Sequence, residues 1–105
     1  MAEFVRVCLK NEIESGSGKV VDLKGKKIAV LNDNGKFFAV DNACAHMQGP
    51  LGEGSCKEEK VTCPWHRWTY DLKTGKNTFS QDIKLNVYEV KIKGEEVLVS
   101  TEAKR

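Results

Sequence analysis

Two short clusters, each with one cysteine and one histidine, constrain this chain more than any other feature of its sequence. Cys44-Ala45-His46 is followed, after sixteen residues, by Cys63-Pro64-Trp65-His66. Thiolate and imidazole are good ligands for transition metals, and this arrangement suits two loops that each supply one sulfur and one nitrogen. The pattern therefore predicts a metal site held by Cys44, His46, Cys63 and His66.

Length and charge narrow the class of protein. The 105 residues suffice for one domain, and 17 basic against 15 acidic residues leave a net charge of only +2. Without a long basic stripe, nothing supports binding to nucleic acid. No apolar run is long enough to cross a bilayer, and the first ten residues do not resemble a signal peptide. We therefore expect no membrane association and a cytoplasmic protein.

Short strands separated by turn signals dominate the pattern, and helical periodicity is weak. We expect strands at 4–9, 19–22, 27–31, 37–41, 68–72, 87–93 and 97–100. Asn34-Gly35 predicts a hairpin turn, because both residues tolerate positive φ. Residues 42–63 are expected to form a turn-rich loop, 77–84 an irregular segment and 101–105 a frayed tail. This predicts one all-β domain over residues 1–105, a small sandwich or barrel.

The residues around both clusters resemble the Rieske iron–sulfur proteins. The matching stretches are Asp41-Asn42-Ala43-Cys44 with Gly49-Pro50-Leu51-Gly52-Glu53-Gly54, and Cys63-Pro64-Trp65-His66 with Trp68, Tyr70, Asp71 and Thr74-Gly75. The resemblance implies a small antiparallel β-sandwich with a two-loop cluster-binding subdomain at about 42–72. It also implies a [2Fe–2S] cluster in which Cys44 and Cys63 hold one iron and His46 and His66 the other.

Several positions depart from other members of that family. Gly49 and Trp65 stand where the proteins of the cytochrome bc complexes carry a bridging pair of cysteines, so that disulfide is not expected. High-potential members place a serine and a tyrosine as donors to sulfur; here Trp68 takes the first position and Tyr70 the second. With one donor of two, we expect a reduction potential in the lower part of the Rieske range.

The resemblance implies an electron-transfer protein that is not an enzyme. We expect a soluble one-electron carrier, the ferredoxin component between an upstream reductase and a downstream Rieske-type oxygenase or reductase. One alternative is the small electron-transfer subunit of a nitrite-reductase-like enzyme. Another is a zinc-stabilised binding module without a redox role, since two cysteines and two histidines also form a zinc set. Of the remaining cysteines, Cys8 is expected to be buried on a strand and Cys56 to lie in a loop.

Overall fold

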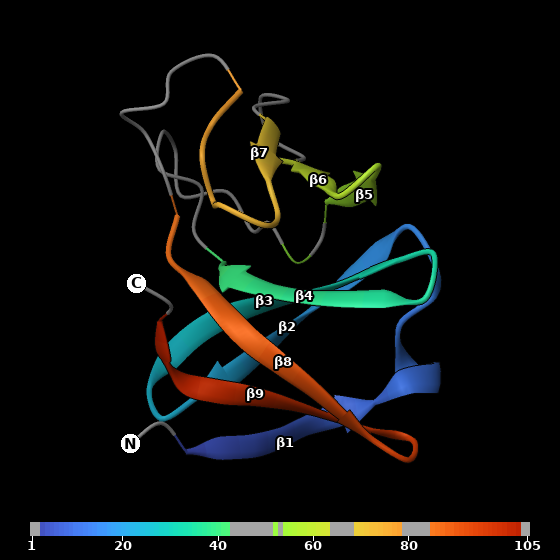
Figure 1. Cartoon of the computed structure of the whole chain (residues 1–105), viewed down its shortest axis with the longest axis vertical. Coiled ribbons are helices and arrows are strands. Elements are labelled where there is room, and N and C mark those ends of the chain that lie inside the picture. Colours follow the sequence, from blue (N-terminus) through green and yellow to red (C-terminus); the bar gives the residue numbers. More distant parts are fainter. Residues whose placement is uncertain (1–2, 43–51, 53, 64–68, 79–84, 104–105) are drawn as a thin grey trace.

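The computed structural model describes residues 3–42, 52, 54–63, 69–78 and 85–103. These residues contain nine strands in two antiparallel sheets and one turn of 3-10 helix, η1 (Lys10–Glu12) (Figure 1). The strands are β1 (Phe4–Leu9), β2 (Ser17–Leu23), β3 (Lys26–Asp33), β4 (Lys36–Asp41), β5 (Ser55–Lys57), β6 (Lys60–Thr62), β7 (Thr69–Asp71), β8 (Val87–Lys93) and β9 (Glu96–Ala103). The predicted all-β antiparallel fold is confirmed.

The larger sheet has the strand order β1-β9-β8-β4-β3-β2 and curls into a near-barrel. In Figure 1 its β2, β3 and β4 form one layer and β8, β9 and β1 the other. The smaller sheet, β5-β6-β7, lies against the outer side of the first layer (Figure 1). The chain thus consists of a barrel-like body and a small sheet that follows β4.

The β3–β4 hairpin separates two hydrophobic cores. On β3, Ile28 and Val30 pack into the barrel, whereas Ala29 and Leu31 pack against the small sheet. All four side chains have zero exposure. Because β3 is covered on both faces, it reads as a continuous apolar run without alternation. The same hairpin therefore contributes side chains to the core of the body and to the core under the small sheet.

The structure confirms one predicted turn and reveals another that the sequence did not indicate. Asn34 and Gly35 have φ values of 53° and 93°, as a type I′ hairpin turn requires. Glu58 and Glu59 also have positive φ, 54° and 62°, and connect β5 to β6 inside the stretch that was predicted to be a loop. The expectation of a structureless 42–63 is therefore wrong for its second half.

The C-terminal prediction also needs correction. Strand β9 extends to Ala103 and is not frayed from residue 101. Its register places Ala103 opposite Tyr88, and Thr101 N donates to Glu3 O at 2.8 Å. The end of β9 is held by both neighbouring strands. In the part of the chain that the structure describes, no helix has the length and apolar character needed to span a bilayer.

Candidate metal centre

Cys63 is the predicted ligand that lies within the described residues. It directly follows β6 and has zero exposure, in an apolar cluster with Tyr70, Leu72, Leu85 and Val87. A thiolate in such surroundings is costly unless a metal compensates its charge. The position of Cys63 therefore fits a sulfur ligand to iron. The other three predicted ligands, Cys44, His46 and His66, lie outside the described residues, so the ligand set stays a prediction.

Hydrogen bonds fix the ends of both predicted cluster loops. Gly52 N donates to Asn42 Oδ1 at 2.8 Å, which joins the two ends of the first loop. Thr62 and Thr69 face each other in the β6–β7 register, with their hydroxyls 3.3 Å apart, at the two ends of the second. Both loops therefore start from closed, ordered stems.

The residues on either side of 79–84 are held in the same way. Thr78 N donates to Thr69 O at 2.9 Å, and Leu85 N donates to Gly75 O at 2.7 Å. Asn86 then connects to the first loop, because Asp41 N donates to its carbonyl at 3.1 Å. A continuous set of hydrogen bonds thus links the stems of the two predicted cluster loops through the segment that precedes β8.

Gly52 is required by close packing. A Cβ on Gly52 would lie 2.6 Å from Val20 Cγ2 and 3.0 Å from Lys19 C, and a Cβ on Gly18 would lie 2.9 Å from Gly52 O. The first loop therefore returns directly onto β2. The N–H of Gly52 is bonded to Asn42 Oδ1 and is therefore not available to a cluster sulfur.

Asp41 anchors the start of the first loop, a role that was not predicted from the sequence. Its Oδ1 accepts from the Tyr88 hydroxyl at 2.8 Å, and its Oδ2 accepts from Asn86 N at 3.0 Å. Burial is the larger cause, and the hydrogen bond to Asp41 the second, of a rise in the pKa of Tyr88 to about 12. Tyr88 therefore remains a hydrogen-bond donor at neutral pH and fixes the chain three residues before Cys44. A carboxylate at the end of a predicted strand could have indicated an anchoring role, but no sequence pattern identifies Tyr88 as its partner.

Tyr70, the predicted hydrogen-bond donor to a cluster sulfur, lies on β7, beside the strand that leads to Cys63. It is fully buried on β7, opposite Val61 of β6, and shares the apolar cluster of Cys63. Placement on a strand next to the one that leads to Cys63 agrees with the predicted role. The bond from its hydroxyl to a cluster sulfur stays a prediction.

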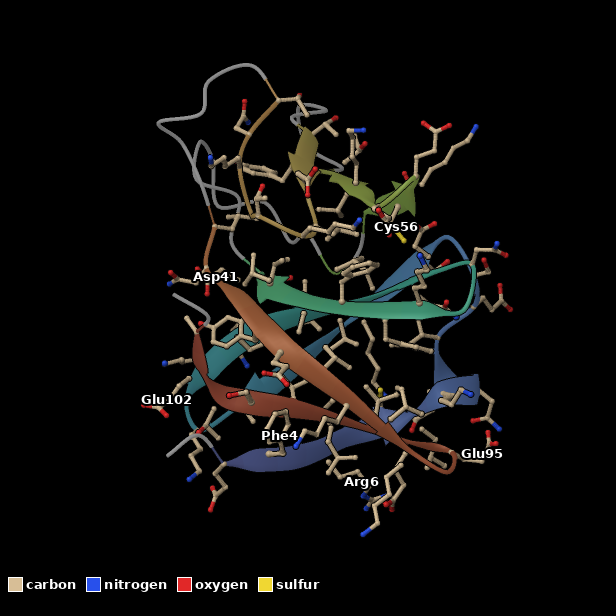
Figure 2. The ribbon with its side chains drawn as sticks, in the orientation of Figure 1. Phe4, Arg6, Asp41, Cys56, Glu95 and Glu102 are labelled. Carbon is tan, nitrogen blue, oxygen red and sulfur yellow. The ribbon has the colours of Figure 1, made fainter. Side chains whose placement is uncertain are left out.

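The two remaining cysteines are structural. Cys8 is buried on β1, as predicted, whereas Cys56 lies on β5 and not in a loop. The Cys56 thiol lies between the two sheets (Figure 2) and donates to Asn32 O at 3.2 Å. Burial raises the pKa of Cys56 to about 11 and also raises that of Cys8. Both are free thiols held in the unreactive protonated form.

Glu59 connects the small sheet to the body. Its backbone N–H donates to Asp33 Oδ2 at 2.6 Å, and its carbonyl accepts from Leu72 N at 2.8 Å. Its carboxylate pairs with Lys73 at 2.9 Å and with Lys36 at 3.3 Å. The hydrogen bond from Lys73 is the main reason why the pKa of Glu59 is lowered. This residue holds the β5–β6 turn against the β3–β4 turn.

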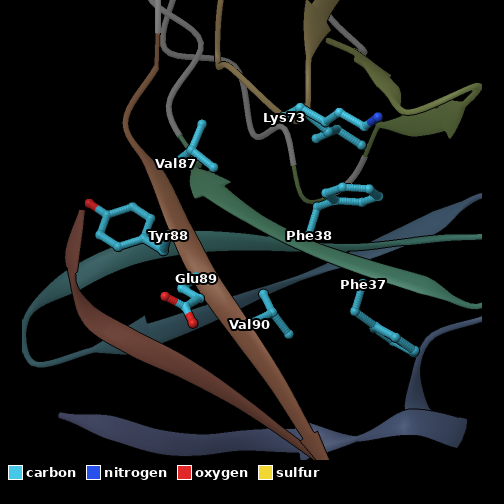
Figure 3. A pocket seen from close by; sticks show the side chains of 8 residues that line it. Phe37, Phe38, Lys73, Val87, Tyr88, Glu89 and Val90 are labelled. Carbon is cyan, nitrogen blue, oxygen red and sulfur yellow. The ribbon is translucent and has the colours of Figure 1, made fainter. Parts of the chain in front are cut away.

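A groove of about 370 Å³ opens where β4 and β8 diverge (Figure 3). The two strands pair only through Ala39–Tyr88 and Val40–Val87. Figure 3 shows Phe38 and Val87 on one side of these strands and Phe37 and Val90 on the other. Lys73 and Glu89 are the charged residues of its lining.

Comparisons with known proteins agree with the resemblance. A model of the Rieske [2Fe-2S] domain matches residues 3–89. Apoptosis-inducing factor 3 of Homo sapiens is 34% identical over 89% of this chain, but the chain spans only 16% of that protein. The biphenyl dioxygenase ferredoxin subunit of Pseudomonas sp. strain KKS102 is 32% identical over 91% of this chain and 90% of its own length.

A solved structure, the complex of reduced oxygenase and oxidized ferredoxin in carbazole 1,9a-dioxygenase, contains a similar chain. It superposes with a TM-score of 0.86 at 28% identity and covers 97% of this chain and 96% of that chain. The likeness therefore extends over the body and the small sheet together.

Proposed function

This chain belongs to the Rieske [2Fe-2S] domain family, and we propose that it is a one-electron carrier, the ferredoxin component of an oxygenase system. The observation that carries the proposal is the match, nearly end to end, with a dioxygenase ferredoxin subunit. Members of this family hold a [2Fe–2S] cluster, which favours iron–sulfur over the zinc alternative.

We propose that Cys44 and Cys63 hold one iron and that His46 and His66 hold the other. With two thiolate and two neutral imidazole ligands, an oxidised [2Fe–2S] centre has no net charge, so it accepts an electron more readily than one with four thiolates. The cluster would supply one-electron redox chemistry. The zero exposure of Cys63, the described ligand, supports this assignment.

The described residues would position and shield such a centre. Cys63 and Tyr70 share an apolar cluster that excludes water, and burial of this kind is one factor that sets a reduction potential. Asp41, held by Tyr88 and Asn86, fixes the approach to Cys44. Fixed surroundings of this kind suit an electron carrier, because little has to rearrange when the charge of the centre changes.

We propose a reductase as the electron donor and a Rieske-type oxygenase as the acceptor. Support for the acceptor comes from the solved complex of an oxygenase with its ferredoxin. We also propose a cytoplasmic location, because Cys8 and Cys56 are free thiols, as expected in a reducing compartment. The alternative of a small subunit in a nitrite-reductase-like enzyme would be recognised by a companion chain that co-purifies stably.

The first experiment is visible absorption and EPR spectroscopy of the freshly purified protein, oxidised and reduced. We expect a red-brown chromophore and a rhombic reduced signal with an average g below that of an all-cysteine cluster. His66→Cys should lose the cluster or lower its potential, whereas Cys8→Ala, a cysteine distant from the loops, should leave the signal intact. A colourless protein with stoichiometric zinc would refute the proposal.

A further inference from the structure

The outward face of the small sheet carries two rows of side chains. Residues directly opposite each other in an antiparallel sheet point to the same side. One row contains hydroxyl groups, on Ser55, Thr62 and Thr69. The other contains Lys57, Lys60 and Asp71. The residues between the rows, Cys56, Val61 and Tyr70, are buried against the body.

The charged row continues past β7. Tyr70 forms a bridge with Asn77, and Asp71 N donates to Lys76 O at 2.8 Å, so Lys76 stands next to Asp71 in the same row. Lys57, Lys60 and Lys76 are all exposed. We refer to these three residues as the lysine row. Asp71 is only half-exposed, and its Oδ1 accepts from Lys73 N and Thr74 N within the following turn.

Lys57 and Lys60 face each other across β5 and β6, and Asp71 is the other cross-strand neighbour of Lys60. The two lysines are cross-strand partners, and like charges in that position destabilise a sheet. In the part of the chain that the structure describes, neither forms an ion pair, whereas Lys36 and Lys73 beside the same turn both pair with Glu59. The neighbouring Glu58 lines a separate groove with Asp33 and Lys36. The face therefore carries three exposed lysines around one carboxylate, an excess of positive charge that an acidic partner would complement.

Lys57 and Lys60 lie on the same small sheet as the residues that flank the second predicted cluster loop. Thr62 directly precedes Cys63, and Thr69 faces Thr62 across the β6–β7 pair. The lysine row is two residues further along the same strands, roughly 7 Å from the hydroxyl row. Lys60 begins β6 and Cys63 directly follows its end, so a partner bound on this face would be one three-residue strand away from Cys63.

We propose that the lysine row docks an acidic surface on a protein electron-transfer partner. The proposal rests on the proposed function and adds to it the charge of the partner and the face that meets it. A flat face with three lysines, one carboxylate and a row of hydroxyls suits the mixed polar rim of a transient protein complex. Binding to nucleic acid instead depends on many phosphate contacts, and this face offers few cations.

The test compares two one-electron carriers of opposite charge, flavodoxin, which is acidic, and cytochrome c, which is basic. Stopped-flow absorbance gives the second-order rate constants for electron transfer between each carrier and the holoprotein. The variant is Lys57→Gln with Lys60→Gln. The matched control is Lys10→Gln with Lys93→Gln, which removes the same charge near Glu95, at the end of the molecule far from the small sheet (Figure 2).

At low ionic strength we expect the variant to lower the rate constant with flavodoxin roughly tenfold, because charge complementarity acts mainly on association. The rate constant with cytochrome c should not fall, and the control should keep the wild-type rate with flavodoxin. At high salt the difference between variant and wild type should disappear. Equal flavodoxin rates for variant, control and wild type would overturn the proposal.

Two further outcomes separate the possible failures. If the wild type has no [2Fe–2S] EPR signal, the proposed function fails and not merely the docking face. If flavodoxin rates are unaffected but wild-type protein sediments with phosphatidylcholine vesicles containing phosphatidylserine, and the Lys57/Lys60 variant does not, the face binds lipid headgroups and the proposal is overturned. Far-UV circular dichroism and the EPR signal confirm that both variants fold and hold the cluster.

Discussion

Replacement of Gly75 by alanine should destabilise the protein far more than replacement of Gly25. Both glycines have positive φ, +79° for Gly75 and +86° for Gly25, so both substitutions force alanine into the left-handed region. That conformation costs roughly 1–2 kcal/mol for a residue with a Cβ. The surroundings differ: a Cβ at Gly25 meets nothing within 4 Å, whereas at Gly75 it would lie 2.2 Å from Leu85 O and 2.9 Å from Val87 Cγ2.

The overlap at Gly75 is with backbone, which cannot rotate away. Leu85 N is itself bonded to Gly75 O at 2.7 Å, so the two segments cannot separate without the loss of that bond. Overpacking of this kind adds about 1–3 kcal/mol. We therefore expect Gly25→Ala to cost about 1–2 kcal/mol and Gly75→Ala about 2–5 kcal/mol. The second value is a large share of the roughly 5–15 kcal/mol that stabilises a typical domain.

The assay is thermal unfolding of the holoprotein at one scan rate, followed by far-UV circular dichroism and by loss of the visible cluster absorbance. Each additional kcal/mol should lower the midpoint by about 4–8 °C in a domain of this size. Because Gly75 is bonded to Leu85, which lies in the apolar cluster of Cys63, its variant should also release the cluster faster at a temperature where the protein remains folded. Equal midpoint shifts for the two variants would show that the Leu85 contact is relaxed in solution and would refute the reasoning.

Three other predictions follow from single side chains. Tyr70→Phe should lower the midpoint potential by loss of a donor to sulfur; an unchanged value in spectroelectrochemistry would remove Tyr70 from that role. The pKa of Glu59 is lowered from its ordinary value of 4.5, so its contribution to stability is present above pH 4.5 and is lost on acidification. Glu59→Gln should therefore flatten the decline of the melting temperature below pH 4.5, and parallel curves for variant and wild type would contradict this. The pKa of Cys56 is raised from 9.0 to about 11, so its contribution to stability is fully present below pH 9.0 and is lost as the pH rises towards 11. The Cys56→Ala variant should therefore lose less stability than the wild type across that range. Iodoacetamide should label Cys56 only after unfolding.

The body of the fold was largely predictable from sequence, because local signals and tertiary packing agree there. Strand β8 was predicted with its observed bounds, since Tyr88 and Val90 alternate with exposed Glu89 and Lys91. Asn34-Gly35 indicated its turn for a stereochemical reason that holds in any context. Both are cases in which neighbouring residues alone determine the conformation.

The small sheet was harder to predict, and the reasons are physical. Strands β5 and β6 have three residues each, too few for alternation to be recognised. The turn between them places Glu58 and Glu59 in a left-handed conformation that their side chains do not favour. Contacts distant in sequence hold it there, above all the bond from Glu59 N to Asp33. Cys56 was assigned to a loop for the same reason, because only the partner strand makes its environment apolar.

The metal-binding chemistry of the site was predictable from sequence, but the hydrogen bonds that hold its loops were not. Soft ligands in two matched clusters indicated a metal, and the buried position of Cys63 agrees with it. Cys44, His46 and His66 remain predictions. The bond between Asp41 and Tyr88 joins residues 47 positions apart, and no local pattern indicates such a pair.

The shared β3–β4 hairpin limits how this domain can be divided or recombined. Excised alone, the segment from β5 to β7 would expose to water the apolar side chains that now pack on Ala29, Leu31 and Val40. The body without that segment would expose the other side of the same hairpin. A graft of the redox unit onto a new scaffold must therefore carry β3 and β4 with it, and a chimera between relatives is best joined outside residues 26–87. The small sheet and its loops can be transferred only together with the β3–β4 hairpin that covers their apolar side.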